Sequence, residues 1–456
     1  MKRRKLILHS FTLLVGANIS SKAFSADTEV RAVPKPSPKK GDGEFVLYSS
    51  TDKQKDVITR LTEGLRNSVL AGKIFKIDED VAIAGTIQVP ASARIEGGDK
   101  WITQDKALTP LFVCDGPGVR RFENINCKGV GADYINNSGV YAAAGITARN
   151  GSSITVKNCR VLNFAGAGVR LMSGAMNCRI DECKITGPGK NYISPKIDNY
   201  GACVVIDGGV QSWVLNGCDL SLSAQGIVTG DDLADVQITR NHIHDIAGQH
   251  GAYIESVRNI EISENEFFNI PLQAMKIQIG SIRADSAERI LIRGNRISHV
   301  GSHGLLLTNP VGGKARLHDF VIRDNKFQDI GESAISLNTC GDGLIESNEM
   351  MSVGRGLYVD SCRSLMVAKN NIRDASKEVV LGVNIKDSSF IQNNFYRSPA
   401  SSNRGALGIS FTGALTSGIA LSQNNVDDAI LNKFSTEKID PSRFDLRNNN
   451  FSFSGK

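Results

Sequence analysis

A short motif recurs through the second two thirds of this 456-residue chain, with one slot that holds asparagine or cysteine. The steps between successive slots are 24, 35, 23, 24, 30, 30, 23, 22, 23, 31 and 25 residues. A base period near 23 residues with some longer steps predicts a solenoid that carries loops in some of its coils. One solenoid explains this repeat better than several globular domains. The slot is filled by Cys159, Cys183, Cys218, Asn241, Asn265, Asn295, Asn325, Asn348, Asn370, Asn393, Asn424 and Asn449.

Alternating residues flank the slot on both sides. Val236–Ile238 precedes Asn241, and Gly251–Ile254 follows it, with apolar residues at every second position. This period of two predicts strands with one buried face. Several strands within 23 residues and no helix between them favour a parallel β-helix, whose coils stack about 4.8 Å apart. Because a single coil cannot bury its own apolar face, the stacking itself makes the core.

Asparagine in a repeating turn predicts a ladder of side-chain amides that donate and accept along the axis. In the earlier coils, cysteine fills the same slot as a small buried residue. No Cys-x-x-Cys pair or Cys/His cluster has the spacing of a zinc site, and the calcium-binding nonapeptide repeat is absent from the sequence. We therefore predict nine buried free thiols, no metal site and no cofactor.

The N-terminal residues predict export. Residues 1–25 combine a basic start, the short apolar run Leu6–Val15 and the small residues Ala23 and Ser25 at a cleavage site. Arg3-Arg4 leaves both the general secretory route and the twin-arginine route open. The apolar run is too short to span a bilayer, and no later segment is long enough, so we expect no membrane span in the mature protein. The expected location is the periplasm or the exterior.

The remaining organisation follows from composition. Residues 26–45 form a Pro/Lys-rich linker, 46–110 contain a capping helix near 52–70 and the first coils, and 111–456 form the β-helix. The net charge is +6, but without residues 1–25 it falls to 48 basic against 47 acidic residues. This balance argues against a nucleic-acid partner. Both a monomer and a homo-oligomer agree with the repeat.

The capping helix, followed by Ile87-Gln88-Val89-Pro90 and by rungs of the form x-Asn-x-Ile and Gly-Ile-x-Leu, resembles the right-handed parallel β-helix proteins of the pectin-lyase-like superfamily. The resemblance covers about residues 50–451 and extends in particular to twin-arginine-exported bacterial β-helix repeat proteins. It implies an all-β right-handed parallel β-helix. A glycine or alanine, such as Gly251 or Ala274, follows each of several slots by eight to ten residues, and we call it the Gly/Ala landmark. The resemblance also implies that substrate lies on the outward face of the strands that follow this landmark. Members include polysaccharide lyases, hydrolases, uronate epimerases and non-enzymatic proteins, so the fold does not decide the activity.

On that face, acids, a lysine, an arginine and a tyrosine gather on adjacent coils. Two carboxylates can hydrolyse a glycosidic bond, whereas a lysine or histidine beside an arginine can drive β-elimination or epimerisation of a uronate. We expect an acidic polysaccharide as the substrate. The proposed catalytic residues are Asp231, Asp232, Glu255, Lys276 and His250, and the proposed substrate-binding residues are Arg283, Tyr253, Gln278 and His303.

Alternatives to a catalytic site remain open from the sequence. Gly230-Asp231-Asp232, Gln249-His250-Gly251 and Lys276-Ile277-Gln278 follow the order of polygalacturonase-like motifs, but their basic motif is rearranged here. His242 and His244 share a face without a third metal ligand. The outward column that contains His242 and Glu266 alternates in charge as a solvated ladder does. A non-catalytic β-helix that binds or scaffolds polysaccharide is the rival prediction.

Overall fold

The computed structural model describes residues 45–47, 56–106, 109–131, 143–188, 201–280, 286–310, 316–398, 407–427, 430–436 and 439–451. The predicted export signal and residues 26–44 of the predicted linker lie outside the described residues, as does Arg283. The fold presented here belongs to the compact unit Phe45–Lys456.

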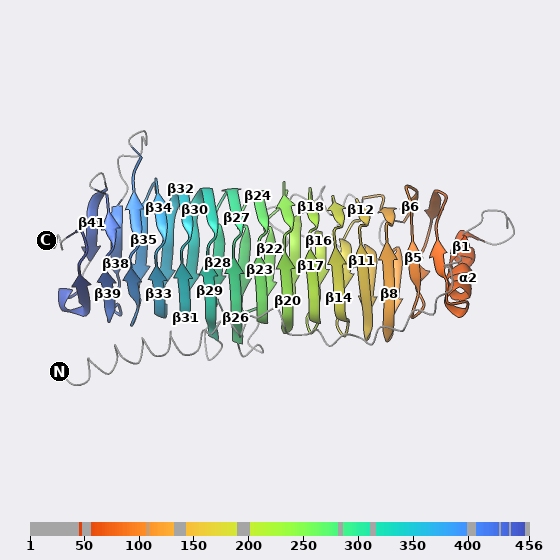
Figure 1. Ribbon diagram of the computed structural model, residues 1–456, viewed down its shortest axis with the longest axis horizontal. Helices are drawn as coiled ribbons and strands as arrows, with labels where there is room; N and C mark the ends of the chain where they lie inside the picture. The colour runs from red at the N-terminus through yellow and green to blue at the C-terminus, as the bar shows by residue number, and fades with distance from the viewer. Residues whose placement is uncertain are drawn as a thin grey trace. The chain divides into compact units, whose positions relative to one another are not determined.

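The described strands form a parallel β-helix with three faces, and successive coils follow one another in chain order (Figure 1). We call the 16-stranded sheet face 1 and the ladder that follows the Asn/Cys slot face 2. The ladder that follows the Gly/Ala landmark is face 3. β30 (Lys326–Asn338) and β32 (Glu349–Asp360) run through both face 2 and face 3, with a register shift between Ile330 and Ser333, and so join these faces into one sheet. The right-handed parallel β-helix prediction is confirmed.

Face 1 comprises β1 (Phe45–Leu47), β2 (Ile74–Lys76), β5 (Arg94–Glu96), β8 (Gly118–Glu123), β11 (Ser152–Lys157), β14 (Met176–Asp181), β17 (Gln211–Asn216), β20 (Leu233–Thr239), β23 (Val257–Ser263), β26 (Ser286–Arg293), β29 (Arg316–Arg323), β31 (Cys340–Glu346), β33 (Arg363–Ala368), β36 (Ser389–Ile391), β39 (Ile419–Ser422) and β42 (Phe444–Arg447). A 3-10 turn, η2 (Pro441–Arg443), precedes the last of these strands.

Faces 2 and 3 share β30 and β32. Face 2 also has β3 (Val81–Ile83), β6 (Trp101–Gln104), β9 (Asn126–Lys128), β12 (Arg160–Leu162), β15 (Lys184–Thr186), β18 (Asp219–Ser221), β21 (His242–His244), β24 (Glu266–Ile270), β27 (Arg296–Val300), β34 (Asn371–Arg373), β37 (Asn394–Tyr396) and β40 (Asn425–Val426). Face 3 also has β4 (Ile87–Gln88), β7 (Phe112–Asp115), β10 (Ala144–Arg149), β13 (Ala167–Leu171), β16 (Ala202–Ile206), β19 (Gln225–Thr229), β22 (Ala252–Glu255), β25 (Met275–Gln278), β28 (Leu305–Thr308), β35 (Glu378–Val383), β38 (Leu407–Thr412) and β41 (Leu431–Thr436).

The asparagine ladder forms as predicted at the turn between face 1 and face 2. Asn265 Nδ2 donates to Asn295 Oδ1 at 3.0 Å, and Asn295 Nδ2 donates to Asn325 Oδ1 at 2.9 Å. Each carboxamide oxygen also accepts the backbone N–H of the preceding asparagine, as Asn295 N donates to Asn325 Oδ1. The same contacts continue from Asn325 through Asn348, Asn370, Asn393 and Asn424 to Asn449.

The ladder also holds a strained turn in place. The residue before each slot adopts a left-handed backbone, with φ of 58° at Glu264 and 57° at Asp324. This conformation is unfavourable for residues other than glycine, asparagine and aspartate, and therefore for Glu264. Asn325 Nδ2 donates to the carbonyl oxygen of Arg323, two residues earlier, and so ties the turn closed from inside. Buried hydrogen bonds of this kind offset the local strain.

Cysteine continues the ladder into the earlier coils as an acceptor. The backbone N–H of Cys183 donates to Cys218 Sγ at 3.4 Å, and that of Cys218 donates to Asn241 Oδ1 at 2.9 Å. All nine cysteines are buried and free, as predicted. Their interior role is therefore both packing and weak hydrogen bonding.

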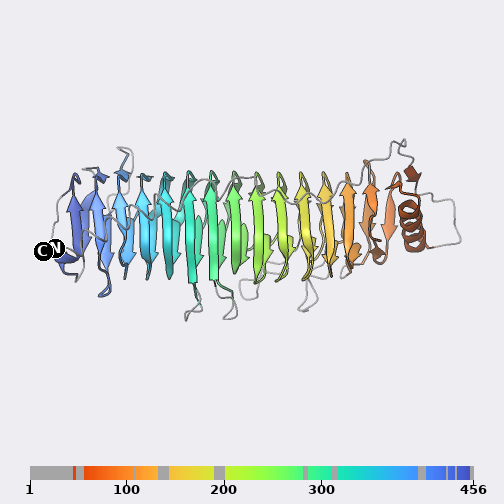
Figure 2. The ribbon, with the colours of Figure 1, turned by 60° about the horizontal axis from the view of Figure 1, so that its bottom comes forward.

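A helix covers the first coils. α2 (Val57–Leu70) buries Leu61 and Leu65 and packs against β1, β2, β3 and β4 at the end of the stack (Figure 2). The Asp56 side chain accepts the backbone N–H of Thr59 at 3.0 Å, so Asp56 is the N-cap of this helix. The helix covers open strand edges that would otherwise pair with other chains. The structure describes no helix long and apolar enough to cross a membrane among the residues given above.

Candidate functional site

Three consecutive coils of face 3 place the candidate residues. β19, β22 and β25 pair in parallel, with Val228 opposite Tyr253, Tyr253 opposite Lys276, and Glu255 opposite Gln278. Neighbouring strands lie about 4.8 Å apart, so side chains in register on these coils are in contact distance. The half-buried side chains of Tyr253, Glu255, Lys276 and Gln278 point outward because the alternate positions Ile254 and Ile277 fill the core.

Glu255 is held by two donors on one oxygen. The Tyr253 hydroxyl donates to Glu255 Oε1, and Gln278 Nε2 donates to the same oxygen at 3.0 Å. Gln278 Nε2 also donates to the Tyr253 hydroxyl oxygen. Behind the side chain, the backbone N–H of Glu255 donates to Thr229 Oγ1 at 3.0 Å. Both donors orient the carboxylate through Oε1, and its second oxygen, Oε2, accepts from neither of them.

Asp231 meets Glu255 above Gly280. Ser256 Oγ donates to Asp231 Oδ1 at 2.8 Å and accepts the backbone N–H of Gly280 at 2.9 Å. A methyl group on Gly280 would lie 2.3 Å from Asp231 Oδ1 and 2.7 Å from Glu255 Oε2. Because both oxygens lie that close to one point, they are at most about 5 Å apart, which is closer than the carboxylate pair of an inverting glycosidase, at about 6.5–9.5 Å. Only glycine leaves room for this pair.

Tyr253 is fixed by a stack of side chains. The His250 ring lies 5.3 Å from the Tyr253 ring, with an interplanar angle of 17°. Lys276 Nζ lies 5.0 Å from the centroid of the same ring. Burial lowers the pKa of the Lys276 ammonium, whereas the negative charge of Glu255 raises it. The phenol therefore contacts a ring and a cation while its hydroxyl orients Glu255.

His250 is a buried neutral imidazole. Burial, followed by the positive charge of Lys276, lowers the pKa of His250 to about 3, and a hydrogen bond with the Gln273 side chain acts in the opposite direction. Its Nδ1 is buried without a hydrogen-bond partner. An imidazole with this pKa carries no proton at neutral pH, which disfavours a role for His250 as a catalytic proton donor. We interpret His250 as the packing support of Tyr253.

The structure does not bring Asp232 and His303 into this cluster. Asp232 has a left-handed backbone (φ 59°), and its exposed carboxylate pairs with Arg258 at 2.9 Å. His303 lies two coils after His250, and its Nε2 is 3.1 Å from Glu332 Oε2. Burial lowers the pKa of His303, and Glu332 raises it.

Sequence reasoning missed Thr229, Ser256 and Gly280. Their roles depend on side-chain contacts between coils, and serine, threonine and glycine are common in every turn of this chain. A glycine two residues after the end of the Lys276 strand is the one signal in the sequence for Gly280. The close approach of two carboxylates requires it.

The second outward column is a solvated ladder, as the alternative interpretation predicted. On face 2, Lys184 Nζ pairs with Asp219 at 3.2 Å, and Lys326 Nζ pairs with Glu349 at 3.1 Å. His242 lies 3.8 Å from Glu266, and His244 contacts both Asp219 and Asp245. Within the part of the chain that the structure describes, no group of three or more His, Cys, Asp or Glu residues is arranged to hold a metal ion.

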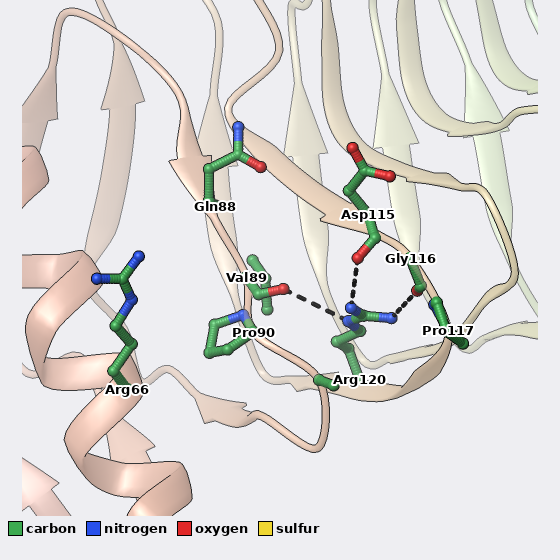
Figure 3. Close-up of a pocket in the computed structure, with 9 residues that line it drawn as sticks. Arg66, Gln88, Val89, Pro90, Asp115, Gly116, Pro117 and Arg120 are labelled. Carbon is green, nitrogen blue, oxygen red and sulfur yellow. Dashed lines mark hydrogen bonds between the residues drawn. The ribbon is translucent and has the colours of Figure 1, made fainter.

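A separate pocket of about 330 Å³ lies near the helix, far along the axis from the carboxylates (Figure 3). Arg120 lines it and is 2% exposed. Its guanidinium donates to the carbonyl oxygens of Asp115, Gly116 and Gly118 at 2.7 to 2.8 Å and to that of Val89 at 3.4 Å. These donors hold the turn together, so we treat the pocket as structural. The candidate site is an open face and not a cavity.

Comparison with known structures agrees with the fold. The tailspike protein 3 of bacteriophage CBA120 has 12% identity and a TM-score of 0.52, and the match covers 90% of this chain and 62% of that one. A tailspike protein mutant of E. coli bacteriophage HK620, in complex with a pentasaccharide, has 13% identity and a TM-score of 0.59, with 86% and 74% covered. This chain thus spans less than two thirds of the length of the CBA120 protein.

The sequence itself carries the family signature. No curated protein matches the chain significantly. A family profile described as a right-handed beta helix region matches residues 123–281 and 272–427. These ranges include every slot from Cys159 to Asn424 and all of the candidate residues of face 3. The chain therefore belongs to the right-handed β-helix family.

Proposed function

We propose that this protein is an exported glycoside hydrolase that cleaves a polysaccharide lying across face 3. The observation that carries the proposal is the convergence of Asp231 Oδ1 and Glu255 Oε2 above Gly280. Two carboxylates in different hydrogen-bond environments are the minimal apparatus for glycoside hydrolysis. The pentasaccharide held by the HK620 tailspike, a protein of similar fold, is consistent with a carbohydrate ligand here.

The two carboxylates take different roles. Glu255, whose Oε1 accepts from Tyr253 and Gln278, is the ionised nucleophile, and its Oε2 bonds to the anomeric carbon. Asp231, in its protonated form, gives a proton to the leaving glycosidic oxygen as the carbon–oxygen bond breaks. A water molecule then attacks the same carbon and gives its proton to Asp231. The glycosyl–Glu255 bond breaks in that step and restores both side chains.

A second candidate activity uses Lys276. Because burial lowers its pKa, this lysine is closer to serving as a base than a solvent-exposed lysine. A neutral amine beside a bound uronate would abstract the proton next to the carboxylate, with Arg283 as the expected carboxylate partner, and would give β-elimination or epimerisation. The products separate the activities: elimination creates new reducing ends together with unsaturated ends that absorb ultraviolet light, hydrolysis creates new reducing ends alone, and epimerisation creates neither.

The test compares Asp231→Asn and Glu255→Gln with Asp232→Asn on a panel of polysaccharides, with reducing ends and ultraviolet absorbance as readouts. Asp232 is the matched control, because its carboxylate is adjacent in sequence but pairs with Arg258. We expect both site variants to lose at least a thousandfold in kcat and Asp232→Asn to stay within threefold. If the wild type and all variants bound polysaccharide but none of them cleaved it, the protein would be a polysaccharide-binding scaffold and not a hydrolase.

The export route is part of the proposal. Residues 1–25 direct the chain to the periplasm or beyond, and the buried thiols suit folding in a reducing cytosol before twin-arginine transport. Replacing Arg3 and Arg4 by lysine is expected to retain the protein in the cytosol. Unchanged export of that variant would indicate the general secretory route.

A further inference from the structure

We infer that the polysaccharide residues bound over Asp231 and Glu255 are uncharged sugars and not uronates. This inference rests on the proposed function and names its substrate class. It departs from the acidic polysaccharide expected from the sequence. Three groups of described side chains carry it: the arginines of face 3, the groups around Lys276, and the residues that follow Gln278 along the axis.

Among the residues that the structure describes, each arginine on the outward positions of face 3 is paired with a carboxylate. Arg149 pairs with Asp115 at 2.7 Å, Arg170 with Asp207 at 2.9 Å, and Arg355 with Glu378 at 2.6 Å. The last two pairs are largely shielded, with side-chain exposures of 16% and 27%, and of 24% and 20%. A bound uronate would have to compete with a resident carboxylate for each guanidinium, so these arginines add little affinity for acidic chains.

The cation at the site is already balanced by an acid. Lys276 lies over the Tyr253 ring, and Glu255 is the acid whose charge raises its pKa. His250, the other basic side chain that contacts Tyr253, is neutral. A uronate at this site would have to compete with Glu255 for Lys276 and would lie beside the Glu255 carboxylate, which disfavours its binding.

Neutral hydrogen-bonding groups extend from the site along the axis. Gln278, Thr308 and Asn338 lie in register on β25, β28 and β30, and all three side chains are half-buried. They repeat about every 4.8 Å, close to the length of one sugar residue. Amides and hydroxyls both donate and accept, and so match the hydroxyl groups of neutral sugars without selecting a charge.

The experiment uses matched substrates that differ only in charge. Polygalacturonate, alginate and glucuronoxylan are each compared with their carboxyl-reduced forms, in which the uronates have become neutral hexoses with the same linkages. Binding and initial rates are measured with the full-length mature protein at 50 and 500 mM NaCl. We expect the reduced form of at least one pair to be favoured tenfold or more, with less than a twofold change between the two salt concentrations.

A charge variant makes the test independent of the polymer panel. Thr308→Lys places a cation in the neutral row, and we expect it to shift the preference at least fivefold toward the native acidic form. Gln328→Lys, at an exposed position of face 2, is the matched control and should shift nothing. If the wild type preferred the acidic forms, and salt weakened that preference, this inference would be wrong. The proposed hydrolase activity would be unaffected. Absence of binding and turnover on every pair would refute the proposed function itself.

Discussion

The side-chain amide of Asn295 donates to the carboxamide oxygen of Asn325 at 2.9 Å, and both residues are completely buried. Asn295 Oδ1 also accepts two N–H groups of Asn265, one from its backbone and one from its side chain. One side chain thus satisfies groups on both neighbouring coils. Such a residue cannot be removed without stranding buried donors that belong to other residues.

We therefore expect Asn295→Ala to destabilise the protein by roughly 1–3 kcal/mol for each buried group left without a partner. Urea unfolding followed by circular dichroism measures the loss. Asn371→Ala is the control, because Asn371 is exposed on face 2 and outside the ladder. Equal unfolding midpoints for the two variants would show that the ladder adds nothing beyond the apolar core.

Because all nine thiols are buried, we expect them to be unreactive toward thiol reagents in the folded protein. Burial raises the pKa of Cys178 to about 11 and that of Cys203 to about 12. Since the thiolate is the reactive form, we expect a thiol reagent at pH 8 to modify no cysteine in the folded protein and all nine in urea. Rapid native labelling of any cysteine, located by mass spectrometry, would contradict the burial of that coil.

The sequence was sufficient for the ladder but not for the choice between neighbouring acids. Asn241 to Asn449 share one turn because an apolar period of two fixes which side chains point inward, and that rule needs no structure. Asp231 and Asp232 are adjacent and chemically identical. The left-handed backbone of Asp232 turns its carboxylate to Arg258. The carboxylate of Asp231 instead reaches Ser256 and Gly280 on later coils. Such pairings depend on turn conformation and on contacts between coils, which no periodicity encodes.

The buried His250 predicts a loss of stability in acid. Its pKa falls from 6.5 to about 3 on folding, so the unfolded chain binds a proton more readily between these values. Stability from this group is complete above pH 6.5 and decreases by about 1.4 kcal/mol for each pH unit below it, down to pH 3. We expect His250→Gln to flatten the melting temperature between pH 7 and pH 5. His242→Gln, on the exposed face 2, should keep the wild-type slope, and parallel slopes for both variants would contradict the assignment.

The short separation of the carboxylates predicts the stereochemistry of hydrolysis. Oxygens at most about 5 Å apart leave no space for a water molecule between the base and the sugar, as an inverting enzyme requires. We expect retention of the anomeric configuration, followed by proton NMR of the first product before mutarotation. A fluorinated glycoside should label Glu255 covalently, and Glu255→Gln should remain unlabelled. Inversion in the NMR experiment would assign the pair a base and acid role instead of a nucleophile and acid role.

The hydroxyl of Tyr253 is expected to affect kcat without affecting the binding of polysaccharide. Its ring contacts His250 and Lys276, and its hydroxyl donates to Glu255 Oε1. Tyr253→Phe keeps the ring and removes only the donor, so we expect kcat to fall 10- to 100-fold while the dissociation constant for polysaccharide and the melting temperature hardly change. Tyr358→Phe is the matched control, because Tyr358 occupies the same column four coils away and hydrogen-bonds Asp360 in place of Glu255. If both variants lost activity equally, the hydroxyl of Tyr253 would have no special place in the reaction. If Tyr253→Phe weakened binding and spared kcat, Glu255 would be a binding carboxylate and not the nucleophile.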